Sequence, residues 1–304
     1  MSAATVSVII PVYNTGEYLR EALDSVLAQT LDNVETIVVN DGSSDSSAAV
    51  IEEYRDRITV ISKEKNAGQA AARNDAMKIA GGKYIYFMDS DDWIEPETLK
   101  CCYELCERDN LDFCFFDGVS FGEKESGSGW QDYHRSAMYA GVRKGHETMC
   151  EMLADGKYRC TVCMSLFRAS FLNKYKLRFQ SGIIHEDELF SALVYFNANR
   201  IESLEAEFYH RRLRGDSTMT RKFDRRNVDG YLTVVDSCIE YVRTFTPDAR
   251  RACRLLVSTI MLSMMHNGYM LPFNEKKRIV KAVMKHPYSF RFKPFCILLL
   301  KGKK

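Results

Sequence analysis

Short apolar runs alternate with helical stripes over the first 116 residues, and this alternation constrains the fold more than any other feature. Strands are predicted at 6–12, 34–39, 58–61, 84–88 and 113–116. Helices are predicted at 18–27, at 67–80 and after Pro96. The order β-α-β-α-β implies a mostly parallel sheet, flanked by helices and joined by right-handed crossovers. The predicted fold class is therefore α/β.

Composition excludes several broad classes of protein. The chain has 304 residues, with 42 Lys and Arg against 41 Asp and Glu, so charge gives no general case for nucleic-acid binding. No signal peptide is expected, and the ten cysteines lack the spacing of a disulfide framework, which favours a reducing cytoplasm. No apolar run approaches the ~20 residues of a membrane span. Cys160 and Cys163 form a single CxxC, which we interpret as free thiols rather than a metal or redox site.

The second part of the chain predicts a different organisation. Glycine and serine concentrate between 118 and 129, which suggests a surface loop. A helix is predicted at 185–197 and a strand at 201–212, and the pattern is helical from Asp224 onward. We therefore divide the chain into a main domain, 1–220, with halves 5–116 and 117–220, and a C-terminal helical region, 221–304.

The strand at 84–88 runs directly into an acidic cluster. Asp89, Asp91 and Asp92 follow it within four positions. Ligands of open α/β sheets bind at the carboxyl ends of strands, and clustered carboxylates favour a hard cation such as Mg²⁺ or Mn²⁺. The alternative is a solvated acidic start to the helix at Pro96 and Glu97.

Three other polar segments are expected at the same edge of the sheet. They are Pro11–Asn14, Asp41–Asp45 and Lys65–Gly68, the last followed by Arg73 one helical turn later. Tyr13 offers a ring for a nucleobase, and Asp41 can accept hydrogen bonds from a base or a ribose. The glycine loops of dinucleotide dehydrogenases and P-loop NTPases are absent from the sequence.

Taken in order, these segments resemble the family 2 glycosyltransferases, which bind nucleotide sugars on a GT-A fold. The matching segments are 8–14, 40–45, 66–74 and 89–92. The resemblance is strong over residues 5–116, weaker to about 220 and absent beyond. It implies transfer of a sugar from a nucleotide-diphosphate sugar, a UDP-sugar by expectation, with Mn²⁺ or Mg²⁺ as cofactor.

The resemblance also implies the roles of individual residues. Asp89 and Asp91 would be the two acids of a DXD motif, with Asp91 on the metal. Arg73 has a structural alternative, in which it pairs with a carboxylate at the sheet edge. The donor-binding residues implied are Pro11, Val12, Tyr13, Asn14, Asp41, Ser43, Asn66, Gly68, Arg73, Asp89 and Ser90.

Two segments of the second part complete the implied active site. Asp187 aligns with the catalytic base and Glu186 with a partner that positions the acceptor, although acids at a helix start can also complement its dipole. His185 would orient these acids. Arg212, Arg214 and Ser217 match a loop that folds over the diphosphate, the alternative being a solvated basic turn. The signature of processive synthases is absent, which favours one sugar per encounter.

These implications give one functional prediction and two alternatives. The prediction is an inverting glycosyltransferase acting on a hydroxyl of a glycan or lipid-linked acceptor, in bacterial surface polysaccharide or glycolipid synthesis. A nucleotidyltransferase is less favoured because its glycine- and arginine-rich phosphate loop is missing. A non-catalytic nucleotide-sugar-binding module is less favoured because Asp89, Asp91 and Asp187 are all present.

The C-terminal segment has an unusual charge pattern. Residues 275–304 contain ten Lys or Arg and one acid, interleaved with apolar residues. This composition fits a helix on an anionic membrane surface, which would place a cytoplasmic protein peripherally on the inner face of the membrane. The alternative is a helical cap with its basic face in water. The oligomeric state cannot be read from the sequence.

Overall fold

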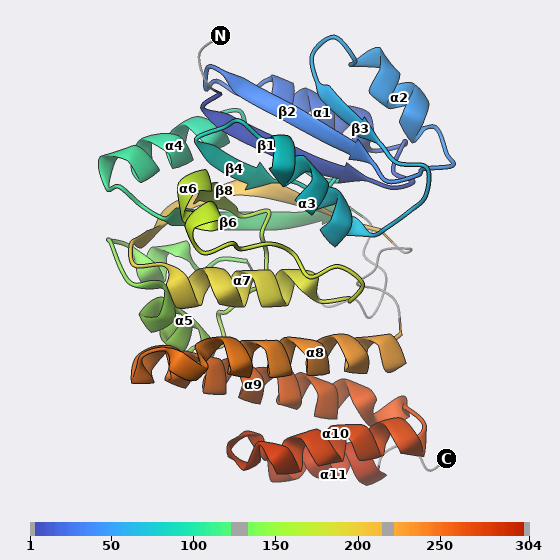
Figure 1. Ribbon diagram of the computed structural model, residues 1–304, viewed down its shortest axis with the longest axis vertical. Helices are drawn as coiled ribbons and strands as arrows, with labels where there is room; N and C mark the ends of the chain where they lie inside the picture. Colours follow the sequence, from blue (N-terminus) through green and yellow to red (C-terminus); the bar gives the residue numbers. More distant parts are fainter. Residues whose placement is uncertain (1–3, 123–132, 215–221, 301–304) are drawn as a thin grey trace.

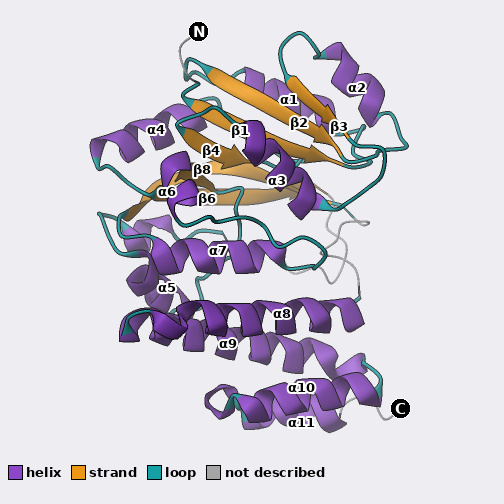
Figure 2. Cartoon of the chain, in the orientation of Figure 1, coloured by secondary structure: helices purple, strands orange, loops and turns teal. Residues whose placement is uncertain are grey.

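The computed structural model describes residues 4–122, 133–214 and 222–300. Figure 1 shows the chain as successive layers, with the sheet and its helices at one end and two layers of C-terminal helices at the other. Figure 2 shows that the strands are confined to the first of these regions. The layers follow the chain closely, so the C-terminal helices lie farthest from the N-terminal strands.

One eight-stranded sheet forms the framework, in the order β3-β2-β1-β4-β7-β6-β8-β5. β1 lies between β2 and β4, parallel to both, and all seven of its residues are buried. A strand covered on both faces needs such a continuous apolar sequence. The bounds are β1 Val6–Val12, β2 Val34–Asn40, β3 Thr59–Ser62, β4 Tyr84–Phe87, β5 Trp93–Ile94, β6 Phe113–Gly122, β7 Ser165–Arg168 and β8 Ile201–Leu213.

Amphipathic helices cover the sheet. In α1 the buried residues Leu19, Ala22, Leu23 and Val26 form the stripe that helical spacing predicts. Farther along the chain, Phe179 stacks on Phe190 of α7 at 4.1 Å between ring centroids, and both contact Phe87 of β4. The bounds are α1 Leu19–Leu27, α2 Ser47–Glu53, α3 Gln69–Ile79, α4 Thr98–Arg108, α5 Gly145–Ala154, α6 Ala169–Lys174 and α7 Glu186–Asn197.

Four helices follow β8. Asp224 caps α8 through the backbone N–H of Arg226, and Thr246 caps α9 through that of Ala249. The bounds are α8 Arg225–Tyr241, α9 Pro247–Asn267, α10 Phe273–Lys285 and α11 Phe292–Leu300. Among the described residues, none of the helices combines the length and the apolar character needed to cross a bilayer.

The α/β class and the flanking helices are confirmed, but three details of the sheet differ from the prediction. β7 is antiparallel and is inserted between β4 and β6, so the sheet is mixed rather than mostly parallel. The two-residue β5 is also antiparallel to its neighbour. β6 continues to Gly122, into the predicted loop 118–129, because it pairs with β8 along its whole length. Such short or paired segments carry little periodic signal of their own.

Candidate functional site

The loops after β1 and β2 are joined by hydrogen bonds at the carboxyl edge of the sheet. Asn14 adopts a left-handed backbone with φ of 52°. Its amide oxygen accepts a hydrogen bond from the Ser44 N–H at 2.8 Å, and its own N–H donates to the Ser43 hydroxyl at 3.2 Å. The preceding Tyr13 is 49% exposed, whereas Pro11 and Val12 are buried in the strand. Tyr13 is therefore the side chain of this loop that is available to a ligand.

Asp41 organises the loop that precedes α3. It is buried, and its carboxylate accepts hydrogen bonds from the N–H groups of Ala67 at 3.1 Å and Gly68 at 2.8 Å. Lys63 adds an ion pair at 2.9 Å. These three donors leave about one of the four acceptor positions of a carboxylate. Gly42 allows the close approach, since its φ is +74° and a Cβ would lie 2.8 Å from the Asn66 nitrogen.

Arg73 joins the acidic end of β4 to the start of α7. Its Nη2 donates to Asp89 Oδ1 at 2.9 Å, and its Nη1 lies 3.7 Å from Glu186 Oε1. The same Asp89 oxygen also accepts from Gln69 at 2.7 Å. The Arg73 side chain is only 3% exposed, whereas that of Asp89 is 35% exposed. The structural alternative predicted for Arg73 is thus present, and it places two separate acidic motifs around one guanidinium.

Asp91 faces the arginines at the end of β8. Arg214 Nε lies 2.8 Å from Asp91 Oδ2, as an ion pair without hydrogen-bond geometry. Arg212 donates to the Asp91 backbone carbonyl at 3.0 Å, pairs with Glu21, and lies over the ring of Tyr18. Burial and the neighbouring Asp89 raise the pKa of Asp91, although Arg214 opposes the shift. Asp91 therefore contacts both arginines, Arg214 through its carboxylate and Arg212 through its carbonyl, while Ser217 lies outside the described residues.

Asp92 and Ser90, the other two residues of the segment 89–92, have structural roles in this arrangement. Asp92 is buried and accepts hydrogen bonds from the hydroxyl of Tyr209 and, at 2.7 Å, from the N–H of Arg212. Ser90 is buried and bonds the hydroxyl of Thr15 at 2.8 Å. Asp92 thus fixes β8 against the segment 89–92 that follows β4, and Ser90 fixes the same segment against the loop after β1.

The first turn of α7 presents three consecutive acids, Glu186, Asp187 and Glu188. His185 holds a left-handed backbone with φ of 69°, an uncommon conformation for a residue other than glycine. Burial and then the nearby Asp187 raise the pKa of Glu186 to about 7. The same two causes raise the pKa of Glu188 to about 8, and the neighbouring Cys160 and Tyr158 oppose the shift. Because both pKa values lie near neutral pH, Glu186 and Glu188 can each gain or lose a proton there.

A cavity of about 690 Å³ extends from the acidic end of β4 to α9. Arg73 and Asp89 line it, as do Asp187 and Glu188 of α7. Arg211 also lines it and bonds the hydroxyl of Tyr133. The far wall comes from the C-terminal helices, through Tyr231 of α8 and Thr259, Ile260 and Ser263 of α9. The cavity thus combines residues of the predicted donor site with residues that no sequence motif indicated.

The C-terminal helices also hold the start of α7 in place. Tyr231 stacks on His185 with ring centroids 3.7 Å apart, and burial lowers the pKa of His185. Asn227 lies 3.4 Å from the His185 ring nitrogen. Gly230 allows α8 to approach, because a Cβ there would lie 2.3 Å from the carbonyl oxygen of Ile184. These contacts give His185 a positioning role that links α7 to α8.

The two cysteines of the CxxC lie in the wall of the same cavity. Both are free, and burial raises the pKa of each thiol well above its ordinary value. The neighbouring acids shift the pKa of both in the same direction. A protonated thiol is a poor nucleophile and a poor metal ligand, so these cysteines act here as small wall residues.

Most of the predicted site residues converge at this edge. The loops after β1, β2 and β3 hold Tyr13, Asn14, Asp41, Ser43, Asn66 and Gly68. After β4, Asp91 contacts Arg212 and Arg214, and Asp89 is bonded to Gln69 and Arg73 of α3. Sequence reasoning missed Arg211, Tyr231, Thr259 and Ser263. Arg211 follows from strand alternation, since it lies on the opposite face of β8 from Arg212. The residues from α8 and α9 carry no local signal, because only packing brings those helices to the cavity.

Comparison with known proteins identifies relatives of this arrangement. Residues 7–176 match the model of the family Glycosyl transferase family 2. EpsH of Bacillus subtilis (strain 168), named as a glycosyltransferase, is 34% identical over 229 residues, which are 73% of this chain and 64% of EpsH. The poly(ribitol-phosphate) beta-glucosyltransferase of Bacillus spizizenii (strain ATCC 23059 / NRRL B-14472 / W23) is 34% identical over 217 residues, 67% of this chain and 32% of that protein. The chain spans less than two thirds of each of these relatives.

The fold also matches solved structures. The crystal structure of S. aureus TarS 1-349 in complex with UDP-GlcNAc superposes with a TM-score of 0.76 at 22% sequence identity. The match covers 97% of this chain and 84% of that one, so it includes the C-terminal helices. The mixed sheet and its flanking helices therefore form the GT-A fold that the sequence predicts.

Proposed function

Because the chain belongs to glycosyl transferase family 2, we propose that it is an inverting enzyme that transfers one sugar from a UDP-sugar to an acceptor hydroxyl. The observation that best supports this proposal is the pair of contacts made by Arg73. Its buried guanidinium lies against both Asp89, after β4, and Glu186, at the start of α7. A group-transfer enzyme needs both half-sites within one cavity, since the reacting atoms must approach to bonding distance.

We assign the donor to the loops after β1, β2 and β3. Tyr13 provides a stacking surface for the base, and the remaining acceptor position of Asp41 suits a base N–H or a ribose hydroxyl. Asn66 and Gly68 lie in the loop that Asp41 holds, where the Gly68 N–H donates to the Asn66 side chain at 3.1 Å. TarS binds UDP-GlcNAc on the same fold, which makes UDP-GlcNAc the first donor to examine. Arg212 and Arg214 are placed to contact the diphosphate.

The acidic end of β4 fits a divalent cation. Asp89 and Asp91 are hard oxygen donors, and burial together with the charge of Asp89 raises the pKa of Asp91. The described residues contain no ready-formed group of three metal-ligating side chains, so diphosphate oxygens would complete the coordination of Mn²⁺ or Mg²⁺. The ion would supply charge stabilisation to the leaving diphosphate. A mannosyltransferase from Pyrobaculum calidifontis with the same fold holds GDP-Man with Mn²⁺.

We propose that Asp187 is the general base. It lines the cavity between the donor edge and the C-terminal wall, whereas Glu186 is turned toward Arg73. Asp187 takes the proton of the acceptor hydroxyl as that oxygen bonds to the anomeric carbon. The bond from the anomeric carbon to the diphosphate oxygen breaks at the same time, and UDP leaves with the electron pair. Glu186, with its pKa near 7, positions the acceptor and balances the charge of Arg73.

The acceptor enters the part of the cavity nearest α8 and α9. Its wall carries an aromatic ring at Tyr231 and hydroxyls at Thr259 and Ser263, which suit a polyhydroxylated chain. One relative acts on poly(ribitol-phosphate), as its name states. We therefore propose a glycan or lipid-linked acceptor in bacterial surface polysaccharide or glycolipid synthesis, on the cytoplasmic side of the membrane.

Calorimetry with UDP, followed by a screen of UDP-sugars for UDP release, tests this function. We expect UDP to bind with Mn²⁺ or Mg²⁺ and to lose affinity when a chelator is added. Asp91→Asn removes one of two carboxylates from the proposed ion and should weaken metal-dependent UDP binding by about tenfold or more. Asp56→Asn makes the same charge change at an exposed turn and should bind normally.

Two outcomes would contradict the proposal. Unchanged UDP affinity in Asp91→Asn would remove the ion from the acidic end of β4. Binding of UDP-sugars without release of UDP, under any metal and with any acceptor mixture, would indicate a binding module instead of an enzyme.

A further inference from the structure

Exposed apolar side chains gather at the C-terminal end of the molecule. Of the eleven large apolar side chains that are exposed among the described residues, seven lie between Met270 and Leu299. Four of them are more than two-thirds exposed: Met270, Phe273, Met284 and Phe292. Single exposed apolar residues are ordinary on protein surfaces, but a concentration in one short segment marks an interaction surface.

Helix α10 carries two opposite stripes. Its inner face buries Ile279 and Val283 against the other C-terminal helices. Its outer face repeats at intervals of three and four residues, which places it on one side of the helix. Together with Leu299 of α11, these outer residues line a groove of about 420 Å³. We call this the α10 groove, and its lining is Phe273, Lys276, Lys277, Val280, Lys281, Met284 and Leu299.

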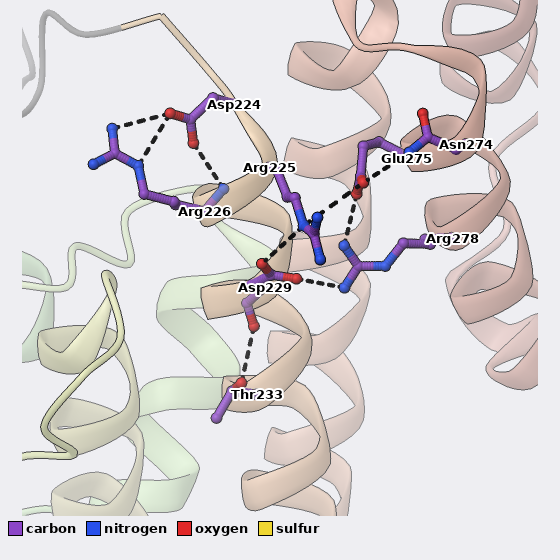
Figure 3. Close-up of polar contacts among 8 residues, drawn as sticks. All are labelled: Asp224, Arg225, Arg226, Asp229, Thr233, Asn274, Glu275 and Arg278. Carbon is purple, nitrogen blue, oxygen red and sulfur yellow. Dashed lines mark hydrogen bonds and ion pairs between the residues drawn. The ribbon is translucent and has the colours of Figure 1, made fainter.

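An ion-pair network fixes which face of α10 turns outward. Figure 3 shows Arg278 between Asp229 of α8 and Glu275 of α10, at 2.5 and 2.6 Å. Arg225 approaches both of these acids from the other side. Because Asp229 is on α8, the network resists rotation of α10 about its axis. The groove is therefore a fixed feature of the surface.

The same network keeps the carboxylate of Glu275 away from the exposed surface of α10. Glu275 is the only acid between 273 and 299, and it is 4% exposed. The outer face keeps its cations, with Lys277 and Lys281 exposed, and Lys277 lies 4.6 Å from the centre of the Phe273 ring. Arg291 and Lys293 follow on exposed positions before and within α11. Apolar and cationic side chains thus share a surface that carries no exposed carboxylate of its own segment.

We propose that the α10 groove holds the protein on an anionic phospholipid surface. Phe273 and Met284 would enter the boundary between headgroups and acyl chains, while the lysines contact lipid phosphates. A second copy of the chain is a poorer occupant, because a two-fold interface would set lysines against lysines. The two interpretations of the sequence are thereby combined, since the inner face of α10 is a cap while its exposed side chains, Phe273, Lys277, Lys281 and Met284, would bind lipid.

Sedimentation with vesicles tests this inference on the full-length protein. We expect it to bind vesicles of phosphatidylglycerol and phosphatidylcholine but not vesicles of phosphatidylcholine alone. Raising the ionic strength from about 0.01 M to about 0.15 M shortens the Debye length from about 30 to about 8 Å and should weaken binding. Each lysine near such a surface contributes roughly fivefold, so Lys277→Gln with Lys281→Gln should weaken binding about 30-fold.

Matched controls make the result specific to the groove. Lys78→Gln with Lys144→Gln removes two exposed lysines elsewhere and should leave vesicle binding nearly unchanged. Phe273→Ser with Met284→Ser should reduce binding with all lysines present. Both residues are exposed, so the melting temperature should not change, whereas deleting α10 would also remove the buried Ile279 and Val283.

Three results would overturn the inference: no binding to anionic vesicles at low salt, equal binding to neutral vesicles, or equal losses in the groove and control variants. A dimer in solution that Phe273→Ser with Met284→Ser converts to a monomer, without vesicle binding, would assign the groove to a second copy. UDP affinity is measured separately, so these results do not depend on the proposed enzymatic function.

Discussion

At the scale of single residues, buried charge is the feature that most clearly marks the site. Arg73 is almost fully buried, yet it has carboxylates on two sides and the ring of Phe179 at 5.1 Å from its guanidinium. Removing one partner of such a group leaves a buried charge uncompensated, which typically costs about 3–5 kcal/mol. The three acids in the first turn of α7 are the counterpart of this cation, and the raised pKa values of Glu186 and Glu188 connect stability to pH.

Glu188 gives a prediction with a definite sign. Its folded-state pKa of about 8 exceeds the ordinary 4.5, so between these values the folded state binds more protons than the unfolded state. Stability should therefore fall by up to about 1.4 kcal/mol per pH unit over that range. Glu188→Gln removes this loss, and its melting temperature should exceed that of the wild type clearly at pH 8 and little at pH 5.

An exposed glutamate provides the control for this measurement. Glu52→Gln changes a side chain that is 70% exposed, and we expect nearly the same melting temperature as the wild type at both pH values. A Glu188→Gln protein that is less stable than the wild type at pH 8 would show that the carboxylate is ionised and favourably bound.

At the scale of elements, contacts between helices and loops decide where the cavity ends. β1, β2 and α1 are predictable, because each has a long apolar run or a helical period of its own. β3 and β4 have only four residues each, and they are predictable from their places in the alternation of strands and helices. β7 has four residues and β5 has two, too few to establish a period, and their places depend on pairing with β4, β6 and β8. The approach of α8 to the turn at His185 is equally invisible in sequence, since it depends on the absence of a side chain at Gly230.

Gly230→Ala tests this contact. In the interior of an exposed helix, alanine stabilises by about 1 kcal/mol relative to glycine. Here the added methyl would lie 2.3 Å from the Ile184 carbonyl oxygen, so we expect a melting temperature several degrees lower. Displacement of the turn should also slow UDP release from a UDP-sugar, while UDP affinity is retained. Glu240→Ala, on the same helix at a 76% exposed position, should not be destabilised. An unchanged or higher melting temperature in Gly230→Ala would show that α8 does not support the turn.

At the scale of the whole molecule, the sequence motifs predict the proposed donor edge but not the proposed acceptor wall. The donor motifs are local, each within a few residues of a strand end, so their convergence follows from parallel topology alone. The wall from α8 and α9 arises only when the C-terminal helices pack beneath α7, as the layers of Figure 1 show. The α10 groove lies one layer farther along the chain, and its exposure depends on the ion pairs to α8.

The most direct test of the central claim separates the base from the donor site. Asp187→Asn keeps the size of the side chain but cannot accept a proton, and a positioned base contributes about 10²–10⁴-fold to rate. We expect UDP release from the accepted UDP-sugar to slow by that order in Asp187→Asn, with calorimetric UDP affinity within a few-fold of the wild type. Glu186→Gln should show a smaller loss, expressed partly in the acceptor KM. A larger loss in Glu186→Gln would exchange the two roles, and full activity in both variants would contradict the assignment of the active site to this cavity.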